Sequence, residues 1–101
     1  MTGAWQLTSA AADDLAQIFL QGFGLFGPDQ ANTYHRGLEG AFLFLANYPR
    51  AARRRDELQP PVRAYPYKRH LIVYEIAEDE TILILRIRHA REDWQNGPIH
   101  G

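Results

Sequence analysis

Hydrophobic side chains in the first half of the chain recur at helical spacing. A short segment with period-two alternation, residues 4–7, comes first and predicts a brief strand. It ends at Thr8 and Ser9, and either hydroxyl is a suitable N-cap for a following helix. That helix is expected to run to about Phe23. Its buried face is predicted to consist of Leu15, Ile18, Phe19 and Phe23.

A second helical pattern follows a glycine-rich break. Pro28 suits a first helical position, and residues 47–49 close the segment because the residue before a proline is pushed out of the α region. The two segments predict an antiparallel helical hairpin. Gly37 and Gly40 lie inside the second helix, and close packing of the two helices is the expected reason. The predicted stripe is Ala31, Tyr34, Leu38, Ala41, Phe42 and Leu45, widened by Leu43 and Phe44.

The second half of the chain has the pattern of strands. Residues 50–61 are polar, rich in arginine and closed by two prolines, which predicts a loop between a helical half and a sheet half. A short strand is expected to stop at Pro66, and the next two strands form a hairpin around an acidic turn without glycine. The predicted strands are residues 62–65, 68–76 and 81–88.

The last predicted strand has two different faces. Period-two alternation places Leu83, Leu85 and Ile87 on a wholly apolar face, which is expected to be core. Two short helices cover only one side of a sheet, so the other face is expected to be open. An exposed apolar patch with a charged rim is typical of a surface that binds a partner protein. That other face carries Ile82, Ile84, Arg86 and Arg88.

Composition limits the classes of protein that remain. The chain has 101 residues, 46% of them hydrophobic, and a formal net charge of -1, which indicates one globular α+β domain, with residues 96–101 as a flexible tail. It contains no cysteine, which excludes disulfides and thiolate zinc sites and suits a reducing cytosol. Neither a signal peptide nor a membrane span is recognisable, so a cytoplasmic protein is expected.

One cluster of residues offers a chemical option. Arg69, Arg86, Arg88 and His89 could hold a phosphodiester, with histidine as the acid that assists attack by a neighbouring 2′-hydroxyl. The alternative is a solvated rim paired with carboxylates, and physical reasoning favours it. Phosphate-binding loops, HExxH and nucleophile-elbow motifs are absent from the sequence.

The order of these segments resembles a known family. The second-helix run RGLEGAFLFLANYPR (residues 36–50) is followed by YKRHLIVYEI (67–76) and ILILRIRHAREDW (82–94). Together they resemble the ParE branch of the RelE/ParE toxin superfamily. The resemblance implies that fold and a toxin of a bacterial type II toxin–antitoxin operon. ParE-branch toxins poison DNA gyrase and block replication, whereas RelE-like relatives cleave messenger RNA on the ribosome.

The resemblance also allows the two activities to be compared. A ribonuclease would use Arg69, Arg86 and His89, but Ala90-Arg91 follows His89 where that branch has a tyrosine, and the chain is not strongly basic. A gyrase inhibitor without catalytic residues, metal or cofactor is therefore favoured, with the ribosome-dependent endoribonuclease as the alternative.

Partners follow from the same resemblance. It implies an acidic, partly disordered ParD-like antitoxin, whose C-terminal segment would wrap the helical hairpin and the sheet. The antitoxin is expected to bind the predicted open face at Ile82, Ile84, Arg86 and Arg88. Contacts to gyrase are expected from Arg88, Arg91 and Trp94. DNA is expected to be reached only indirectly, through the antitoxin complex, and no membrane is involved.

Overall fold

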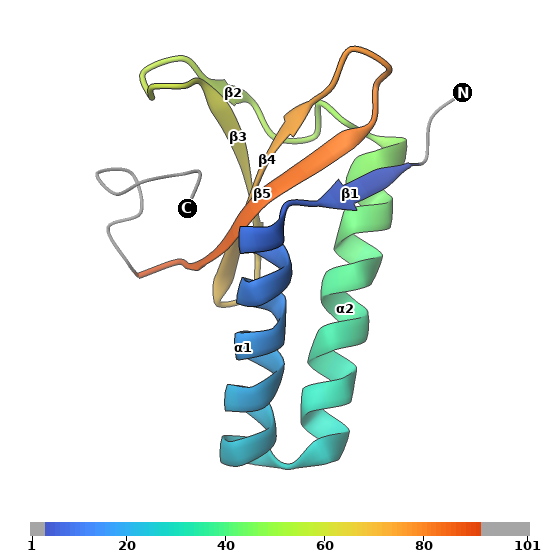
Figure 1. Ribbon diagram of the computed structural model, residues 1–101, viewed down its shortest axis with the longest axis vertical. Coiled ribbons are helices and arrows are strands. Elements are labelled where there is room, and N and C mark those ends of the chain that lie inside the picture. The colour runs from blue at the N-terminus through green and yellow to red at the C-terminus, as the bar shows by residue number, and fades with distance from the viewer. Residues whose placement is uncertain (1–3, 92–101) are drawn as a thin grey trace.

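The computed structural model describes residues 4–91 and has the predicted α+β architecture (Figure 1). A short strand leads into a helical hairpin, and the rest of the chain forms most of a sheet. The elements are β1 (Trp5–Leu7), α1 (Ser9–Phe26), α2 (Pro28–Asn47), β2 (Arg54–Arg55), β3 (Val62–Tyr67), β4 (His70–Ile76) and β5 (Ile82–His89).

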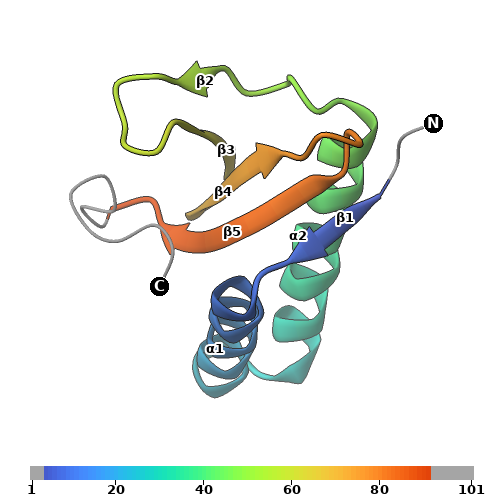
Figure 2. The same ribbon diagram turned by 45° about the horizontal axis from the view of Figure 1, so that its top comes forward.

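The five strands form one sheet in the order β1-β5-β4-β3-β2. Strand β1 runs parallel to β5, and the other neighbours are antiparallel. Both helices lie against the same face of this sheet (Figure 2). Within residues 4–91, neither helix is long and apolar enough to cross a membrane.

Local chemistry fixes the ends of the helices. The Thr8 hydroxyl accepts a hydrogen bond from the Ala11 amide at 3.0 Å and so caps α1. Gly27 connects the helices at φ 89°, in a region that side chains rarely adopt, and Pro28 then takes the first position of α2. The predicted hairpin and the predicted end of α2 are confirmed, whereas α1 continues past Phe23 to Phe26.

The sheet differs from the prediction at β3 and at β2, and β4 begins at His70 rather than at Lys68. Strand β3 does not stop before Pro66, which pairs with Leu71 inside the strand. Strand β2 pairs with β3 only at Val62 and Arg63, so β3 is an edge strand at Pro66, where a missing amide donor is tolerated. Strand β2 was not predicted: its two residues lie within the segment 50–61, which was expected to be a loop.

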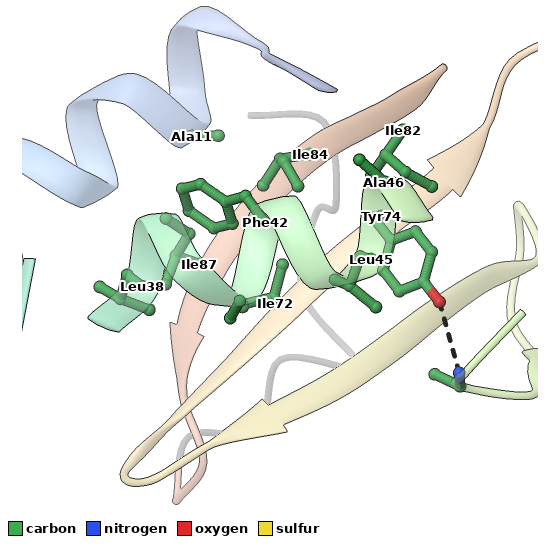
Figure 3. Close-up of a cluster of buried hydrophobic side chains, with 12 residues drawn as sticks. Ala11, Leu38, Phe42, Leu45, Ala46, Ile72, Tyr74, Ile82, Ile84 and Ile87 are labelled. Atoms are coloured by element: carbon green, nitrogen blue, oxygen red, sulfur yellow. Dashed lines mark hydrogen bonds between the residues drawn. The ribbon is translucent and has the colours of Figure 1, made fainter. Parts of the chain in front are cut away.

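The main core fills the space between the helices and the sheet (Figure 3). Phe42 and Leu45 of α2 pack against side chains from β4 and β5. Tyr74 is buried there, and its hydroxyl donates to the Pro49 carbonyl at 2.7 Å, which fastens the loop after α2. The buried members are Ala11, Leu38, Ala41, Phe42, Leu45, Ala46, Ala52, Ile72, Tyr74, Ile82, Ile84 and Ile87.

The prediction for the two faces of β5 was right for Leu85 and Ile87, which are buried, and wrong for Ile82 and Ile84, which were expected on an open face. Val73 pairs with Arg86 but Tyr74 pairs with Ile84, so a bulge leaves Leu85 without a paired residue on β4. The extra residue shifts the alternation, and Ile84 before the bulge and Ile87 after it both point into the core under the helices. Ile82 and Ile84 are each 0% exposed, so neither lies on an open surface.

The opposite face of the sheet is also partly covered. Leu85 packs there in a second cluster with Val62, Ala64, Val73 and Leu58. Leu58 belongs to the loop between β2 and β3, which therefore supplies the cover that two helices cannot. Leu83, predicted as core, is only partly buried beside this cluster.

One glycine of α2 has a clear packing role. A Cβ atom on Gly37 would collide with the Tyr67 hydroxyl and lie 2.8 Å from its Cζ atom. The helix therefore approaches β3 closely at this point. The prediction that packing between the helices explains Gly37 and Gly40 was wrong for Gly37, and a Cβ on Gly40 would meet nothing within 4 Å.

Candidate functional site

Arg86, one of the predicted nuclease residues, is held in an ion pair. Its Nε and a terminal nitrogen donate to the two carboxylate oxygens of Asp14 at 2.7 and 3.0 Å. One of these oxygens also accepts from the Ile87 amide at 2.9 Å. The side chains of Arg86 and Asp14 are only 15% and 17% exposed. This arrangement joins α1 to β5, and the guanidinium is engaged by Asp14 rather than presented to a substrate.

The other two predicted nuclease residues lie together at one end of the sheet. The Ala90 amide donates to the Arg69 carbonyl at 2.8 Å, and His89 pairs with His70 across the strands, with the rings 5.4 Å apart. Arg86 is three residues before His89 along β5, roughly 10 Å away at the usual rise of a strand. Of the three predicted residues, Arg69 and His89 lie at the same end of the sheet, whereas the Arg86 guanidinium is bound to Asp14 of α1.

Sequence reasoning missed a residue at this end of the sheet. Tyr34 was predicted as part of the core stripe, yet its hydroxyl lies 2.7 Å from His70 Nδ1. Burial raises the pKa of Tyr34 above its usual value. The Arg69 guanidinium lies over the rings of Phe26 and Tyr34, at 5.5 and 5.7 Å from their centroids. A period-3.6 pattern identified Tyr34 as inward-facing but gave no indication of this contact.

The predicted antitoxin contacts are not on one accessible surface. Ile82 and Ile84 are buried under the helices, Arg86 is bound to Asp14, and Arg88 is half-buried on β5 opposite Leu71. Of the predicted target contacts, Arg91 is exposed, and Trp94 lies outside the described residues.

The exposed apolar surface is on the helical hairpin instead. A groove of about 500 Å³ runs along α1, with Asn32 and His35 of α2 contributing to its wall. Leu20, at its edge, is 61% exposed. Phe23, predicted to be buried, is exposed beyond the groove. The α1 residues that line the groove are Ala12, Leu15, Ala16, Phe19 and Leu20, together with Leu7 of β1.

A second exposed patch consists of aromatic residues. Phe44 packs against Tyr48 and Tyr65, with ring centroids 5.1 and 5.5 Å apart. Phe44 and Leu43 were predicted to widen the buried stripe of α2, but both are exposed. Among residues 4–91, no cluster of histidine and carboxylate side chains could hold a metal ion.

Comparison with known proteins agrees with this architecture. The family model for the ParE toxin of the type II toxin–antitoxin system parDE matches residues 6–94. Toxin ParE1 of Mycobacterium tuberculosis, strain ATCC 25618 / H37Rv, is 32% identical over 93 residues, which are 92% of this chain and 95% of that protein. The same figures hold for strain CDC 1551 / Oshkosh.

A solved structure shares the fold. It is described as the chromosomal ParDE toxin–antitoxin system from P. aeruginosa and superimposes with a TM-score of 0.73 at 25% sequence identity. The match covers 85% of this chain and 94% of that chain. The chain belongs to the ParE toxin family of type II toxin–antitoxin systems.

Proposed function

We propose that this toxin inhibits DNA gyrase, blocks replication and is neutralised by a ParD-like antitoxin. The observation that carries the proposal is the Asp14–Arg86 ion pair in a chain that matches the ParE toxin model across residues 6–94. A ribonuclease would need Arg86 near the scissile phosphate, whereas here two hydrogen bonds hold it to a carboxylate of α1. A toxin that inhibits gyrase by binding to it does not need an arginine free to contact a phosphate.

The α1 groove is the proposed docking surface for the antitoxin. Its lining is mostly apolar, and the exposed Leu20 at its edge extends the apolar surface toward the end of the helical hairpin. An apolar helix face inserted there would bury side chains at i, i+3 and i+4 spacing. The solved relative is described as part of a ParDE system, which supports an antitoxin of the ParD type. This placement replaces the predicted site on β5.

The direct test is a gyrase supercoiling assay. Purified toxin is added to gyrase and relaxed plasmid, with and without an excess of the antitoxin. We expect loss of supercoiling and accumulation of a trapped cleavage complex, both reversed by the antitoxin. Full supercoiling at micromolar toxin, with no cleaved plasmid, contradicts the proposal.

Arg91 and Arg88 remain proposed contacts to the target. Arg91 is exposed just beyond β5. Arg91→Gln should therefore weaken inhibition of gyrase, whereas Arg53→Gln, which removes the same charge from the loop before β2, should leave inhibition unchanged. Equal inhibition by both variants would exclude Arg91 as a contact.

A ribosome-dependent endoribonuclease is the second candidate. It is favoured by one observation, the proximity of Arg69, His70 and His89 at one end of the sheet with Tyr34 hydrogen-bonded to His70. In a translating extract, this activity predicts messenger cleavage that disappears with Arg69→Ala and with His89→Ala. Intact messenger in the presence of the unmodified toxin excludes it.

A further inference from the structure

Charge is separated along the β4–β5 hairpin. The turn between the two strands carries Glu78, Asp79 and Glu80, and the opposite end lies beside the β3–β4 turn with Lys68 and Arg69 (Figure 1). The formal net charge of the chain is -1, so a basic region can form only by such separation.

The basic end is formed by cations that are exposed and available. Lys68, Arg69 and Arg91 are exposed, and none of them forms an ion pair with a residue in the range 4–91. The backbone brings the β3–β4 turn and the end of β5 side by side, because the Ala90 amide, next to Arg91, donates to the Arg69 carbonyl at 2.8 Å. By contrast, Arg50, Arg53 and Arg54 at the other side of the sheet are all paired with carboxylates.

Aromatic rings lie among these cations. The Lys68 ammonium is 5.6 Å from the centroid of Tyr67, and the Arg69 guanidinium lies over Phe26 and Tyr34. The Phe26 side chain is 48% exposed, so one ring remains accessible beside the cations. Cations that alternate with accessible rings are typical of surfaces that bind single-stranded nucleic acid, because phosphates contact the cations and bases stack on the rings.

A pocket of about 490 Å³ lies at this end between the start of α2 and the β3–β4 turn. Thr33, Tyr34, Lys68 and Arg69 line it, and so does the carboxylate of Asp29, which opposes the approach of a phosphate. Removal of the Asp29 carboxylate should therefore strengthen the binding of a polyanion, whereas removal of a cation should weaken it.

From these observations we propose that the end of the sheet formed by Lys68, Arg69 and Arg91, together with the Phe26 ring, binds single-stranded nucleic acid. Phosphates contact the three cations, and a base stacks on Phe26. This is a direct contact with nucleic acid, unlike the indirect contact through an antitoxin that the family resemblance implied. It does not depend on gyrase being the target.

Fluorescence anisotropy of the full chain with a short labelled oligothymidylate tests the proposal. We expect binding at about 50 mM salt that weakens toward 200 mM, with a slope of log K against log salt of about -2 for three phosphate contacts. Lys68→Gln and Arg69→Gln should each reduce the magnitude of this slope by about 0.7. Phe26→Leu should lower affinity about fivefold or more, and Asp29→Asn should raise it. Circular dichroism verifies that each variant folds.

Matched controls distinguish a defined surface from general attraction. Arg53→Gln removes one charge far from this surface and should leave affinity unchanged. Equal losses for Arg53→Gln and Arg69→Gln, or no binding at about 50 mM salt, overturn the proposal. Poly-glutamate that binds as tightly as the oligonucleotide, together with no effect of Phe26→Leu, assigns the surface to acidic protein segments and also overturns it. An oligouridylate probe then distinguishes RNA from DNA.

Discussion

Asp14 and Arg86 connect the helical hairpin to the strand on which the predicted nuclease residues lie. The carboxylate of α1 accepts two hydrogen bonds from the guanidinium and a third from the Ile87 amide. The Asp14 contacts fall next to the bulge of β5, where the regular pairing with β4 is interrupted. The last β1–β5 pair is Leu7 with Ile84, so Asp14 supplies the acceptor for the Ile87 amide beyond the end of β1, and the ion pair gives Arg86 a structural role.

Replacing Asp14 with alanine should destabilise the fold. The change removes the carboxylate from a mostly buried guanidinium and the acceptor from the Ile87 amide, a loss of roughly 2–4 kcal/mol in the free energy of unfolding. Urea denaturation measures it. Asp13→Ala is the matched control, since Asp13 is exposed, and it should change stability by less than about 0.5 kcal/mol. Equal stability of the two variants would show that the ion pair contributes nothing.

Thr8→Val removes the hydroxyl that caps α1 but keeps the branched shape of the side chain, so it should measure the contribution of the cap to stability. The hydroxyl accepts from the Ala11 amide and donates to the Leu85 carbonyl at 2.8 Å, so it serves both α1 and the bulge. We expect a loss of roughly 1–2 kcal/mol, measured by thermal or urea unfolding. Thr33→Val is the control: its exposed hydroxyl donates only to the Asp29 carbonyl of the same helix, so its removal should lower stability less. A larger loss of stability for Thr33→Val than for Thr8→Val would contradict the assignment of Thr8 as the cap.

Two glycines of α2 should respond to alanine in opposite directions. Gly40→Ala places its methyl in open space and should raise stability by about 1 kcal/mol through helix propensity. Gly37→Ala should lower stability by roughly 1 kcal/mol or more, because the Tyr67 ring must move. Unfolding curves of both variants test this difference. If the contact with Tyr67 is responsible, combining Gly37→Ala with Tyr67→Ala should yield a non-additive recovery.

The Arg50–Glu80 ion pair predicts a dependence of stability on pH. The hydrogen bond from Arg50, followed by its charge, lowers the pKa of Glu80 below its usual 4.5. A lowered folded-state pKa contributes stability that is present above 4.5 and lost as the pH falls through the folded value. Melting temperatures between about pH 5 and 3 should therefore fall less steeply for Glu80→Gln than for the unmodified chain.

High salt provides the control for this ion pair. Because Arg50 and Glu80 are exposed partners, about 1 M NaCl should reduce the difference between the two pH profiles. Parallel profiles at low salt would show that Glu80 does not contribute in this way.

A charge in the α1 groove should weaken the antitoxin complex. Leu20→Glu places a carboxylate on the proposed apolar surface, and affinity measured by titration calorimetry should fall about tenfold or more. Folding should be little affected because Leu20 is exposed. Gln17→Glu adds the same charge at an exposed position of α1 that does not line the groove, and it should bind normally. Unchanged affinity for Leu20→Glu would exclude this groove.

Ile84→Asp should behave differently from Leu20→Glu. Ile84 is fully buried in the core, so a carboxylate there is expected to prevent folding rather than to weaken a partner selectively. Loss of the cooperative unfolding transition, followed by circular dichroism, is the expected result. A folded Ile84→Asp variant with weakened antitoxin binding would instead support the original placement on β5.

Local signals in the sequence determined most of the elements. The hydroxyl of Thr8, the sequence Gly27-Pro28 and Pro49 after α2 act through the backbone of neighbouring residues, so their effects could be predicted without the fold. The helical hairpin followed from them, the β4–β5 hairpin followed from the strand patterns on both sides of the acidic turn, and the two together indicated the α+β class. The family resemblance rested on the order of the same segments.

Tertiary structure alone decided which side chains are exposed. The bulge beside Leu85 depends on pairing between β4 and β5, and its single extra residue places Ile87 on the same core face as Ile82 and Ile84, which were predicted to be on the surface. The ion pair of Arg86 required Asp14, 72 residues away in sequence. Periodicity reports the spacing of side chains within one element, whereas the candidate site depends on register and contacts between elements that no local pattern records.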